Sequence, residues 1–95
     1  MIIQTIKFQS RLSEEEVLRI AREREPQFQK ISGLIQKYYI KLPQENHYGG
    51  IYVWDSRESL NAFRNSELAA GIPKAYGIVE TPSIEVVDVL FQLKD

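Results

Sequence analysis

The residues with the most chemical potential are aromatic and lie close together in the sequence. Tyr48, Tyr52 and Trp54 are separated by even numbers of residues, so they share one face if their segment is a strand. Gly50 leaves a gap between the rings, which suits a planar aromatic ligand. Tyr39 is a further candidate for substrate binding. The alternative is that these rings only pack against a second subunit.

Lys37 is the cation best placed to act on such a ligand. It alternates with Ile35 and Tyr39, so a lysine stands among apolar side chains on one face of a strand. Its charge would favour a phenolate or a reduced oxygen species. Equally, its alkyl stem could cover the edge of a sheet while the ammonium reaches water.

His47 and Asp88 are the candidates for proton transfer. A histidine titrates near a pH of about 6.5, and His47 would accept a phenolic proton if it lies at the mouth of a pocket. Asp88 interrupts an otherwise apolar strand, where an aspartate facing a barrel interior acts as a base or a hydrogen-bond anchor. The alternatives are a solvated histidine in a polar loop and an ion pair of Asp88 across a subunit interface.

Several classes of function are disfavoured by what the sequence lacks. It contains no cysteine, which removes thiolate chemistry and thiolate metal sites. It also lacks a cluster of metal-ligating residues, a nucleophile–base pair and a phosphate-binding glycine loop, for which Gly49-Gly50 alone does not serve. We therefore expect no metal and no cofactor, and hydrolases and nucleotide enzymes are disfavoured.

Composition and charge limit the partners. With 43% hydrophobic and 26% charged residues, the chain has the balance of one globular domain, which we assign to residues 1–95. Its formal charge of -1 offers no broad positive field for a phosphate backbone, so nucleic acid is not expected. Residues 1–8 lack the features of a secretory signal, and no apolar run has membrane-spanning length. A soluble cytoplasmic protein without a membrane partner is therefore expected.

The pattern of apolar residues and turn signals predicts four strands and two main helices. The strands are expected at residues 2–9, 34–42, 48–54 and 84–93. Ser13 and Glu16 form a capping box that begins the first helix. Pro26 is expected to kink or break this helix near Glu25, and Gly33 is expected to end it.

The second half of the chain carries its own helix signals. The second helix is expected to begin at Asp55, which forms a capping box with Glu58. Ser66 caps one further short turn, for which Gly71 supplies a left-handed exit. The charged run at residues 14–25 is interpreted as the solvated face of the first helix, without a function.

These elements follow the order βαββαβ, which is the ferredoxin-like α+β arrangement of four antiparallel strands with helices on one face. We expect the compact residues Gly49, Ile51 and Val53 to pack beneath the helices, with the aromatic residues on the opposite face. Large apolar side chains left in water forfeit about 1.5–3 kcal/mol each, and such patches mark association surfaces. A homodimer with two sheets packed face to face is therefore expected.

One further pattern is a resemblance to a known family. The residues that carry it are Gly33-Leu34-Ile35 through Lys37, then Gly49-Gly50-Ile51-Tyr52-Val53-Trp54 before a capped helix. They resemble the antibiotic-biosynthesis-monooxygenase type of dimeric α+β barrel, in particular its branch of small monooxygenase-like proteins. The similarity covers the whole chain in the order of its elements, and it implies a ferredoxin-like subunit that works as a homodimer.

The resemblance also implies a range of activities. Relatives include cofactor-free oxygenases that act on electron-rich phenols, and enzymes that degrade haem. The haem-degrading relatives use an asparagine, a tryptophan and a histidine that lies on the second helix. His47 is the only histidine here, and it precedes the third predicted strand. Haem degradation is therefore disfavoured.

The leading hypothesis from the sequence is a homodimeric, cofactor-independent monooxygenase-like protein that oxidises a small phenol or quinol. Oxygenation without a metal or flavin requires a substrate that itself gives an electron to O2. The candidate catalytic residues are His47, Lys37 and Asp88, and the candidates for substrate binding are Tyr39, Tyr48, Tyr52 and Trp54. The alternatives on the same scaffold are a non-catalytic small-molecule-binding or stress-related protein and an isomerase- or decarboxylase-like relative.

Overall fold

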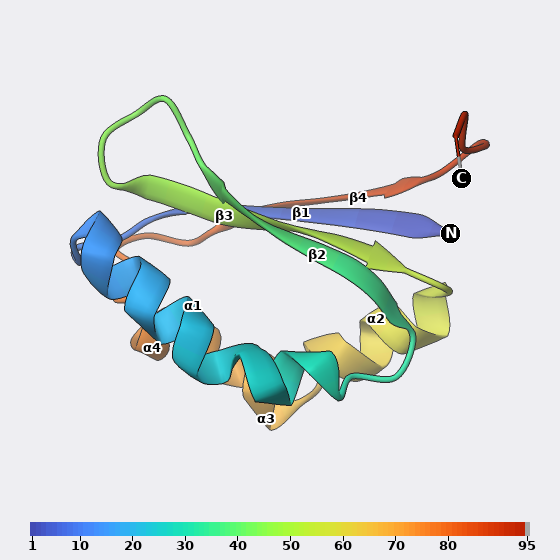
Figure 1. The fold of residues 1–95 in the computed structure, drawn as a ribbon, viewed down its shortest axis with the longest axis horizontal. Coiled ribbons are helices and arrows are strands. Elements are labelled where there is room, and N and C mark those ends of the chain that lie inside the picture. Colours follow the sequence, from blue (N-terminus) through green and yellow to red (C-terminus); the bar gives the residue numbers. More distant parts are fainter. Residues whose placement is uncertain (95) are drawn as a thin grey trace.

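Four strands form one antiparallel sheet in the computed structural model, which describes residues 1–94 (Figure 1). They are β1 (Ile2–Gln9), β2 (Leu34–Lys41), β3 (His47–Trp54) and β4 (Ser83–Asp88). Their spatial order is β2-β3-β1-β4, and every neighbouring pair is antiparallel. The central strands β1 and β3 are therefore hydrogen-bonded on both sides, while β2 and β4 are edges.

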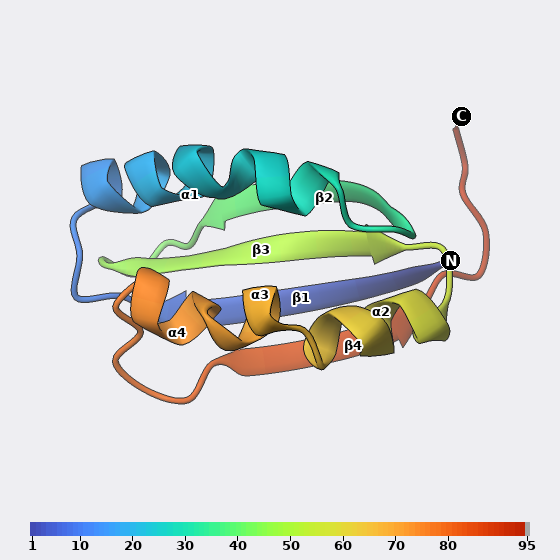
Figure 2. The same ribbon diagram turned by 90° about the horizontal axis from the view of Figure 1, so that it is seen from below.

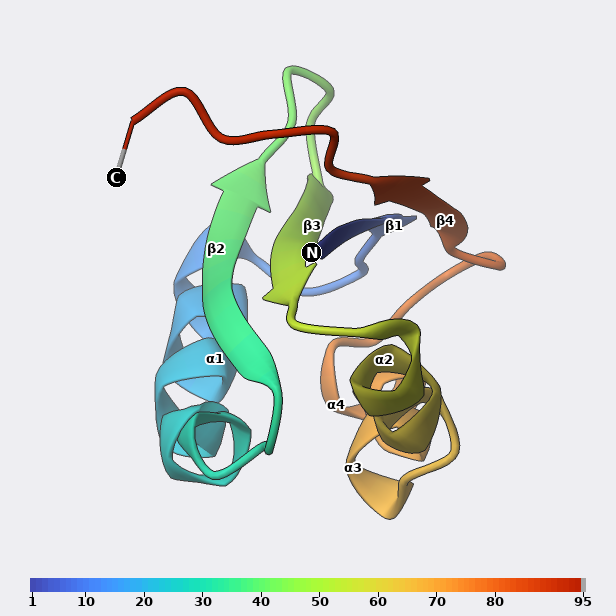
Figure 3. The same ribbon diagram turned by 90° about the vertical axis from the view of Figure 1, so that its right-hand side faces the viewer.

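All helices lie on one face of this sheet (Figure 2). Helix α1 (Glu14–Gln29) runs along β2 and β3, whereas α2 (Arg57–Arg64), α3 (Glu67–Ala70) and α4 (Ile72–Ala75) lie beneath β1 and β4 (Figure 3). Ser66 caps α3, as predicted. The βαββαβ order and the ferredoxin-like α+β arrangement are confirmed. Within residues 1–94, none of the helices has the length and apolar character to cross a membrane.

The core between the sheet and the helices is rich in aromatic rings. Trp54 is fully buried, and its ring stacks on that of Tyr52 with the centroids 6.0 Å apart and the planes 3° from parallel. The ring of Phe63 on α2 packs against both of these rings, and its centroid lies 5.4 Å from that of Tyr52 and 5.3 Å from that of Trp54. The indole Nε1 of Trp54 donates a hydrogen bond of 3.0 Å to Oε1 of the buried Gln4. The polar atom of this ring is thus satisfied inside the core.

The face of β3 that packs against the helices is the aromatic one. Tyr48, Tyr52 and Trp54 are buried there, whereas Ile51 and Val53 occupy the other face and are partly exposed. The prediction that the compact residues lie beneath the helices was therefore wrong. The physical reason is volume, because the space between a sheet and a helix layer must be filled to near-crystalline density, and large rings fill it.

Helix α1 begins with the predicted capping box. The Ser13 Oγ accepts a hydrogen bond of 3.2 Å from the Glu16 amide, and Glu16 Oε1 accepts one of 3.2 Å from the Ser13 amide. Of the kink or break predicted near Glu25, the break does not occur, because the helix continues past Pro26 to Gln29. Pro26 and Arg22 are both exposed, so the carbonyl group freed by the proline can bind water. Burial of Phe28 in the core then holds the last turn in place.

Three turn positions also differ from their predictions. Helix α1 ends before Gly33, whose φ of +83° makes the turn into β2 instead. Ser56, rather than Asp55, caps α2 and accepts a hydrogen bond from the amide three residues on. Gly71 has a φ of -82°, so the chain continues directly into α4, and Gly77, with a φ of +57°, supplies the left-handed turn.

Strand β4 is shorter than predicted. It ends at Asp88, which pairs with Ile2, the first residue of β1, so that the partner strand runs out at this point. The Val89 amide still donates a hydrogen bond of 3.0 Å to the carbonyl oxygen of Met1. The apolar residues that follow are largely exposed, namely Leu90 at 94%, Phe91 at 78% and Leu93 at 84%.

Candidate functional site

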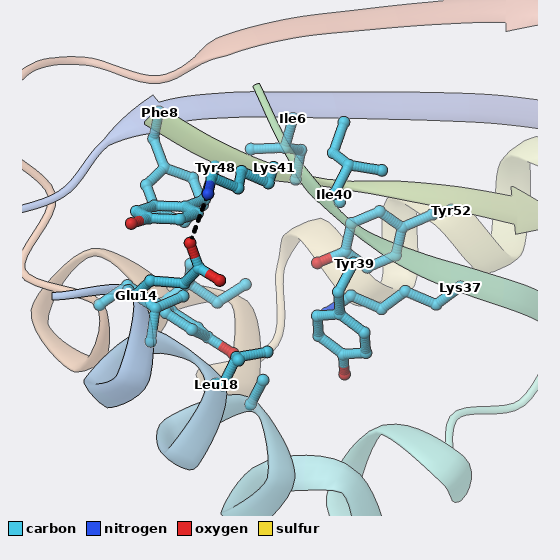
Figure 4. Close-up of a pocket in the computed structure, with 16 residues that line it drawn as sticks. Ile6, Phe8, Glu14, Leu18, Lys37, Tyr39, Ile40, Lys41, Tyr48 and Tyr52 are labelled. Atoms are coloured by element: carbon cyan, nitrogen blue, oxygen red, sulfur yellow. Dashed lines mark ion pairs between the residues drawn. The ribbon is translucent and has the colours of Figure 1, made fainter. Parts of the chain in front are cut away.

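A cavity of about 120 Å³ lies between the sheet and the helices (Figure 4). Its walls come from β1, β2, β3, α1 and α4, and most of the side chains that line it are apolar or aromatic. The lining rings are Phe8, Tyr39, Tyr48, Tyr52 and Tyr76, and the charged lining residues are Glu14, Lys37 and Lys41. An apolar cavity with a few polar groups is the usual form of a small-molecule site.

The two adjacent glycines of β3 have different roles beside this cavity. A Cβ atom at Gly50 would lie 3.1 Å from Tyr52 Cε1 and 3.3 Å from Lys37 Cε, so the missing side chain leaves room there. A Cβ atom at Gly49 would instead overlap the carbonyl oxygen of Ile6. Gly49 therefore permits the close approach of β1 to β3, and Gly50 keeps the cavity open.

The side chain of Lys37 extends from β2 into a group of aromatic rings. Its Nζ lies 3.7 Å from the ring centroid of Phe28 on α1. The centroids of Tyr39 and Tyr52 are 4.3 Å and 4.5 Å away. Such cation–π contacts contribute about 0.5–2 kcal/mol each, the larger value when water is excluded. Within residues 1–94 no carboxylate forms an ion pair with Lys37, so rings hold this cation.

The surroundings of Lys37 lower its pKa to about 7. Burial is the largest cause, because it disfavours the ammonium, and the positive charge of Arg24 is the second. The three rings act in the opposite direction, since they attract the cation. An exposed lysine has a pKa of about 10.4, so the neutral amine is far more populated at Lys37 near neutral pH.

Three tyrosines that line the cavity keep their protons at neutral pH. Burial raises the pKa of Tyr76 to about 12, and it also raises the pKa of Tyr52 and of Tyr39. The nearby Tyr39 raises the pKa of both other tyrosines further. The hydroxyl of Tyr76 is buried without a hydrogen-bond partner among the described residues. Tyr76 also lines the cavity, so this hydroxyl is a candidate partner for a polar group of a ligand.

Arg24 of α1 is a second cation close to Lys37. Its Cζ lies 5.9 Å from the Phe28 ring centroid, and its Nη2 donates a hydrogen bond of 3.1 Å to the carbonyl oxygen of Leu68. The interpretation of the charged run of α1 as only a solvated face was therefore wrong at this position. The signal was present, because Ala21, Arg24 and Phe28 follow the spacing of three and four residues that marks one helix stripe.

An exposed ion pair stands at the outer end of the cavity. Lys41 Nζ lies 2.7 Å from Glu14 Oε1, and the pair joins the end of β2 to the first turn of α1 (Figure 4). Exposed ion pairs stabilise a fold by only about 0–1 kcal/mol. This pair neutralises the two charged groups at the outer end, so among the lining residues within positions 1–94 Lys37 is the charged group without an ion pair.

The structure gathers part of the predicted site. Lys37, Tyr39, Tyr48 and Tyr52 line the cavity, and the rings of Tyr39 and Tyr52 lie next to each other in it (Figure 4). Trp54 does not line the cavity, because it lies behind Tyr52 in the core.

His47 and Asp88 lie away from the cavity. The Nδ1 of His47, at the start of β3, is 2.9 Å from the carbonyl oxygen of Glu45. Asp88 ends the edge strand β4, and its two carboxylate oxygens accept hydrogen bonds of 3.2 Å and 3.3 Å from Arg57 Nη2. The ion pair of Asp88 is therefore formed within the chain. Among residues 1–94, no group of three or more acidic or histidine side chains could hold a metal ion.

The comparison with family sequences decides where the chain belongs. Residues 2–93 match the family described as "Putative mono-oxygenase ydhR". The chain belongs to this family. The ydhR match spans nearly the whole sequence, and it confirms the resemblance to the antibiotic-biosynthesis-monooxygenase group. No curated protein sequence gives a significant match.

Solved structures share the fold of this ydhR-family chain. NE2512, a protein of unknown function from Nitrosomonas europaea, has a TM-score of 0.81 and 16% identity over 99% of this chain and 93% of that one. SnoaB, a cofactor-independent oxygenase from Streptomyces nogalater, has a TM-score of 0.78 and 12% identity, covering 99% and 97%. A "Putative antibiotic biosynthesis monooxygenase" from Bordetella bronchiseptica has a TM-score of 0.77 and 16% identity, covering 95% and 98%. Likeness at these identities establishes the fold alone.

Proposed function

We propose that this ydhR-family protein is a cofactor-independent monooxygenase that oxidises a small phenol or hydroquinone in the cavity between the sheet and the helices. The observation that carries the proposal is Lys37, an amine without a carboxylate partner in the described chain, on the wall of an aromatic cavity. Oxygenation of a phenol without a cofactor requires at least a base and a surface beside it that binds the planar ring. The shared fold with SnoaB, described as a cofactor-independent oxygenase, supports the reaction type.

The proposed reaction balances without an added reductant. A phenol loses its hydroxyl proton and transfers electrons to O2. One oxygen atom is transferred to a ring carbon that carries a hydrogen, which is the carbon opposite the hydroxyl group in a phenol and the carbon next to a hydroxyl group in a hydroquinone. The other oxygen atom leaves as water, with the hydrogens of the former O–H and C–H bonds. The product is a quinone, and every electron that reduces O2 comes from the substrate.

Lys37 acts first as a base and then as a cation in this proposal. Its neutral amine, populated because its pKa is lowered to about 7, accepts the phenolic proton. The resulting ammonium stands beside the phenolate and the reduced oxygen species and favours both. The rings of Tyr39 and Tyr52, which flank Nζ, hold the ring of the substrate, and Tyr48 completes the wall.

The other residues predicted for the site take supporting roles or none. Trp54 positions Tyr52 through the parallel stacking of their rings. His47 and Asp88 are left out of the proposed chemistry, because neither lines the cavity and Asp88 is engaged by Arg57.

The open face of the sheet is proposed to pack against a second copy of the chain. On this face Tyr38 pairs with Ile51 and is 55% exposed, and Val87 on β4 is 45% exposed. The fold of this family is typically dimeric, which supports the proposal. The helices of residues 1–94 all lie on the opposite side of the sheet (Figure 3). A cytoplasmic location, favoured by the absence of cysteine, belongs to the same proposal.

A second candidate function is a non-catalytic binding protein for small aromatic molecules. It is favoured by the positions of His47 and Asp88 outside the cavity, because Lys37 is then the one base that remains of the three predicted catalytic residues. The cavity alone would then be the functional feature, and no reaction would follow binding.

Oxygen uptake with a panel of single-ring phenols and hydroquinones tests the two candidates. The monooxygenase should consume one O2 for each phenol converted to quinone. Lys37→Met should lower kcat/KM by about 100-fold or more, the loss expected for a general base. Lys74→Met removes an exposed lysine of α4 and should leave kcat/KM unchanged. Ligand binding without oxygen uptake would favour the binding protein, and uptake that Lys37→Met retains would exclude Lys37 as the base.

A further inference from the structure

Lys37 has the surroundings of a nucleophile as well as those of a base. An amine becomes nucleophilic when it is desolvated in an apolar pocket or lies next to another cation, because both effects disfavour the ammonium. Lys37 meets both conditions. Its Nζ lies on the aromatic wall of the cavity, and Arg24 stands against the same Phe28 ring at 5.9 Å. Within residues 1–94 its side chain makes no hydrogen bond and no ion pair.

The neighbouring charges are fixed in place. Arg24 is held by its hydrogen bond of 3.1 Å to the carbonyl oxygen of Leu68. The acid next to it in the chain, Glu25, forms an ion pair of 3.2 Å with Arg22. The acid on the cavity wall, Glu14, is already paired with a lysine at the outer end. Within residues 1–94, the acids nearest in the chain or on the cavity wall are therefore paired with other cations, and none forms an ion pair with Lys37.

The titratable groups of the cavity wall and of the neighbouring turn of α1 agree with this arrangement. Arg24 and Glu25 come from α1, Tyr39 from β2, Tyr52 from β3 and Tyr76 from the end of α4. The tyrosines stay neutral because burial raises their pKa values. Burial and Arg24 lower the pKa of the Lys37 amine to about 7, so a large neutral fraction exists at neutral pH.

The aromatic rings around Lys37 would also stabilise the imine that forms when an amine condenses with an aldehyde. An amine that reacts with an aldehyde becomes an imine, whose protonated form carries its positive charge on the same nitrogen. The rings of Phe28, Tyr39 and Tyr52, at 3.7 Å, 4.3 Å and 4.5 Å from Nζ, would stabilise that cation as they do the ammonium. The low-water environment favours condensation, since water is released.

The volume of the cavity limits the size of the ligand. It holds about 120 Å³, and a dry engineered cavity of about 150 Å³ binds benzene. The present cavity is somewhat smaller, so one aromatic ring is the largest planar group that we expect it to enclose, with substituents directed toward its outer end. A fused two-ring ligand is not expected to fit without movement of the lining.

We propose that Lys37 forms a Schiff base with a single-ring aromatic aldehyde bound in this cavity. The amine nitrogen attacks the carbonyl carbon, and a C=N bond replaces the C=O bond. The carbonyl oxygen leaves as water with the two hydrogens of the amine, so no oxidant or reductant takes part. This activity does not rest on the proposed oxygenation, because it needs no O2.

Reductive trapping tests the proposal directly. The full-length protein is incubated without oxygen at neutral pH with benzaldehyde and cyanoborohydride, which reduces an imine to a stable benzylamine. Peptide mass spectrometry then measures the rate of labelling at each lysine. We expect Lys37 to be labelled about 100-fold faster than the exposed Lys7 and Lys74, because its neutral fraction near pH 7 is roughly 1000-fold higher than that of a lysine side chain in water.

Controls separate a site from general reactivity. Lys74→Met should keep the fast label, whereas Lys37→Arg, which retains the charge, should lose it. A two-ring aldehyde should lose the preference for Lys37. Equal labelling of all lysines by benzaldehyde in the wild-type chain would overturn the proposal, and that result depends on no variant being folded. Because the labelling assay is anaerobic, its result does not test the proposed monooxygenase reaction, which oxygen uptake tests separately.

Discussion

Phe28 and Lys37 meet across the two layers of the molecule, with the ring centroid of Phe28 on α1 lying 3.7 Å from Nζ of Lys37 on β2. Phe28 is also buried in the core, where its ring lies 6.0 Å from that of Phe63. One residue of α1 therefore packs against the core and against the amine of the cavity at once. The protonation of Lys37 should consequently be measurable as a change in the stability of the whole fold.

Lys37→Met should stabilise the fold at neutral pH by about 1–3 kcal/mol, because it removes a buried amine and fills the same apolar surround. The folded chain loses the Lys37 proton near pH 7, as burial lowers this pKa, whereas the unfolded chain keeps it to about pH 10.4. Between these values the unfolded state binds more protons, so the stability of the wild type rises with pH. The advantage of the variant is therefore greatest at and below pH 7 and disappears as the pH approaches 10.4. Urea unfolding of both proteins across this range measures it, and a difference independent of pH would contradict it.

Gly49 and Gly50 provide a matched pair of substitutions. Gly49→Ala should destabilise the fold by about 2–4 kcal/mol, because its Cβ would overlap the backbone carbonyl of Ile6, which cannot move without disturbing the sheet. Gly50→Ala should cost less than about 1 kcal/mol, since its two closest contacts would be side-chain atoms of Tyr52 and Lys37, and the backbone oxygen of Tyr38 would lie at an ordinary contact distance of 3.7 Å. The second variant should nevertheless weaken the binding of a single-ring ligand by about tenfold, by filling the cavity. Thermal unfolding and ligand titration of both variants test this, and equal destabilisation would show that the two glycines share one role.

Local features of this fold were predictable because their signals lie within a few residues. The capping box of Ser13 and Glu16 and the order of the elements are of this kind, and so is the shared face of Lys37 and Tyr39. Alternation along β3 predicted two faces but contained no information on which face meets the helices. That choice depends on the volume available between the layers, which is a property of the whole fold.

The composition of the site shows the same division. Lys37 was predicted because a lysine among apolar residues of a strand is unusual, and Tyr52 was predicted because aromatic residues alternate along its strand. Arg24 and Phe28 approach the Lys37 amine from helix α1. Their positions depend on how α1 packs against β2, and the periodicity of strands and helices does not specify this packing. Asp88 interrupts an apolar strand and forms an ion pair with Arg57. In the sequence alone, a structural aspartate of this kind has the same pattern as a functional one.

The hydrogen bond between Gln4 and Trp54 should show strong energetic coupling. Gln4→Leu should destabilise the fold by about 1–3 kcal/mol, because the indole N–H stays buried without an acceptor. Adding Trp54→Phe removes that unsatisfied donor, so the double variant should be less destabilised than the sum of the two single variants. A double-mutant cycle by denaturant unfolding measures the difference, for which we expect about 1–2 kcal/mol. Additive single effects would mean that water replaces the glutamine.

The open face of the sheet leads to a prediction about assembly. Tyr38 stands on edge strand β2 opposite Ile51, and both belong to the face that carries no helix (Figure 3). If a second copy covers this face, Tyr38→Glu would place a charge in an apolar interface and remove an aromatic contact. Such a change costs several kcal/mol at the centre of an interface, so the dimer dissociation constant should rise by about 100-fold or more.

Gln27→Glu provides the matched control, because it adds the same charge on the exposed side of α1, away from the sheet. Sedimentation equilibrium of the wild type and both variants over a range of concentrations measures the dissociation constants. The wild type and Gln27→Glu should sediment as dimers, and Tyr38→Glu should sediment as a folded monomer with the circular dichroism of the wild type. A monomeric wild type would mean that the exposed apolar residues of this face need another partner. A dimer that tolerates Tyr38→Glu would place the contact elsewhere on the sheet, with Val87 and the exposed residues after β4 as the next positions to substitute.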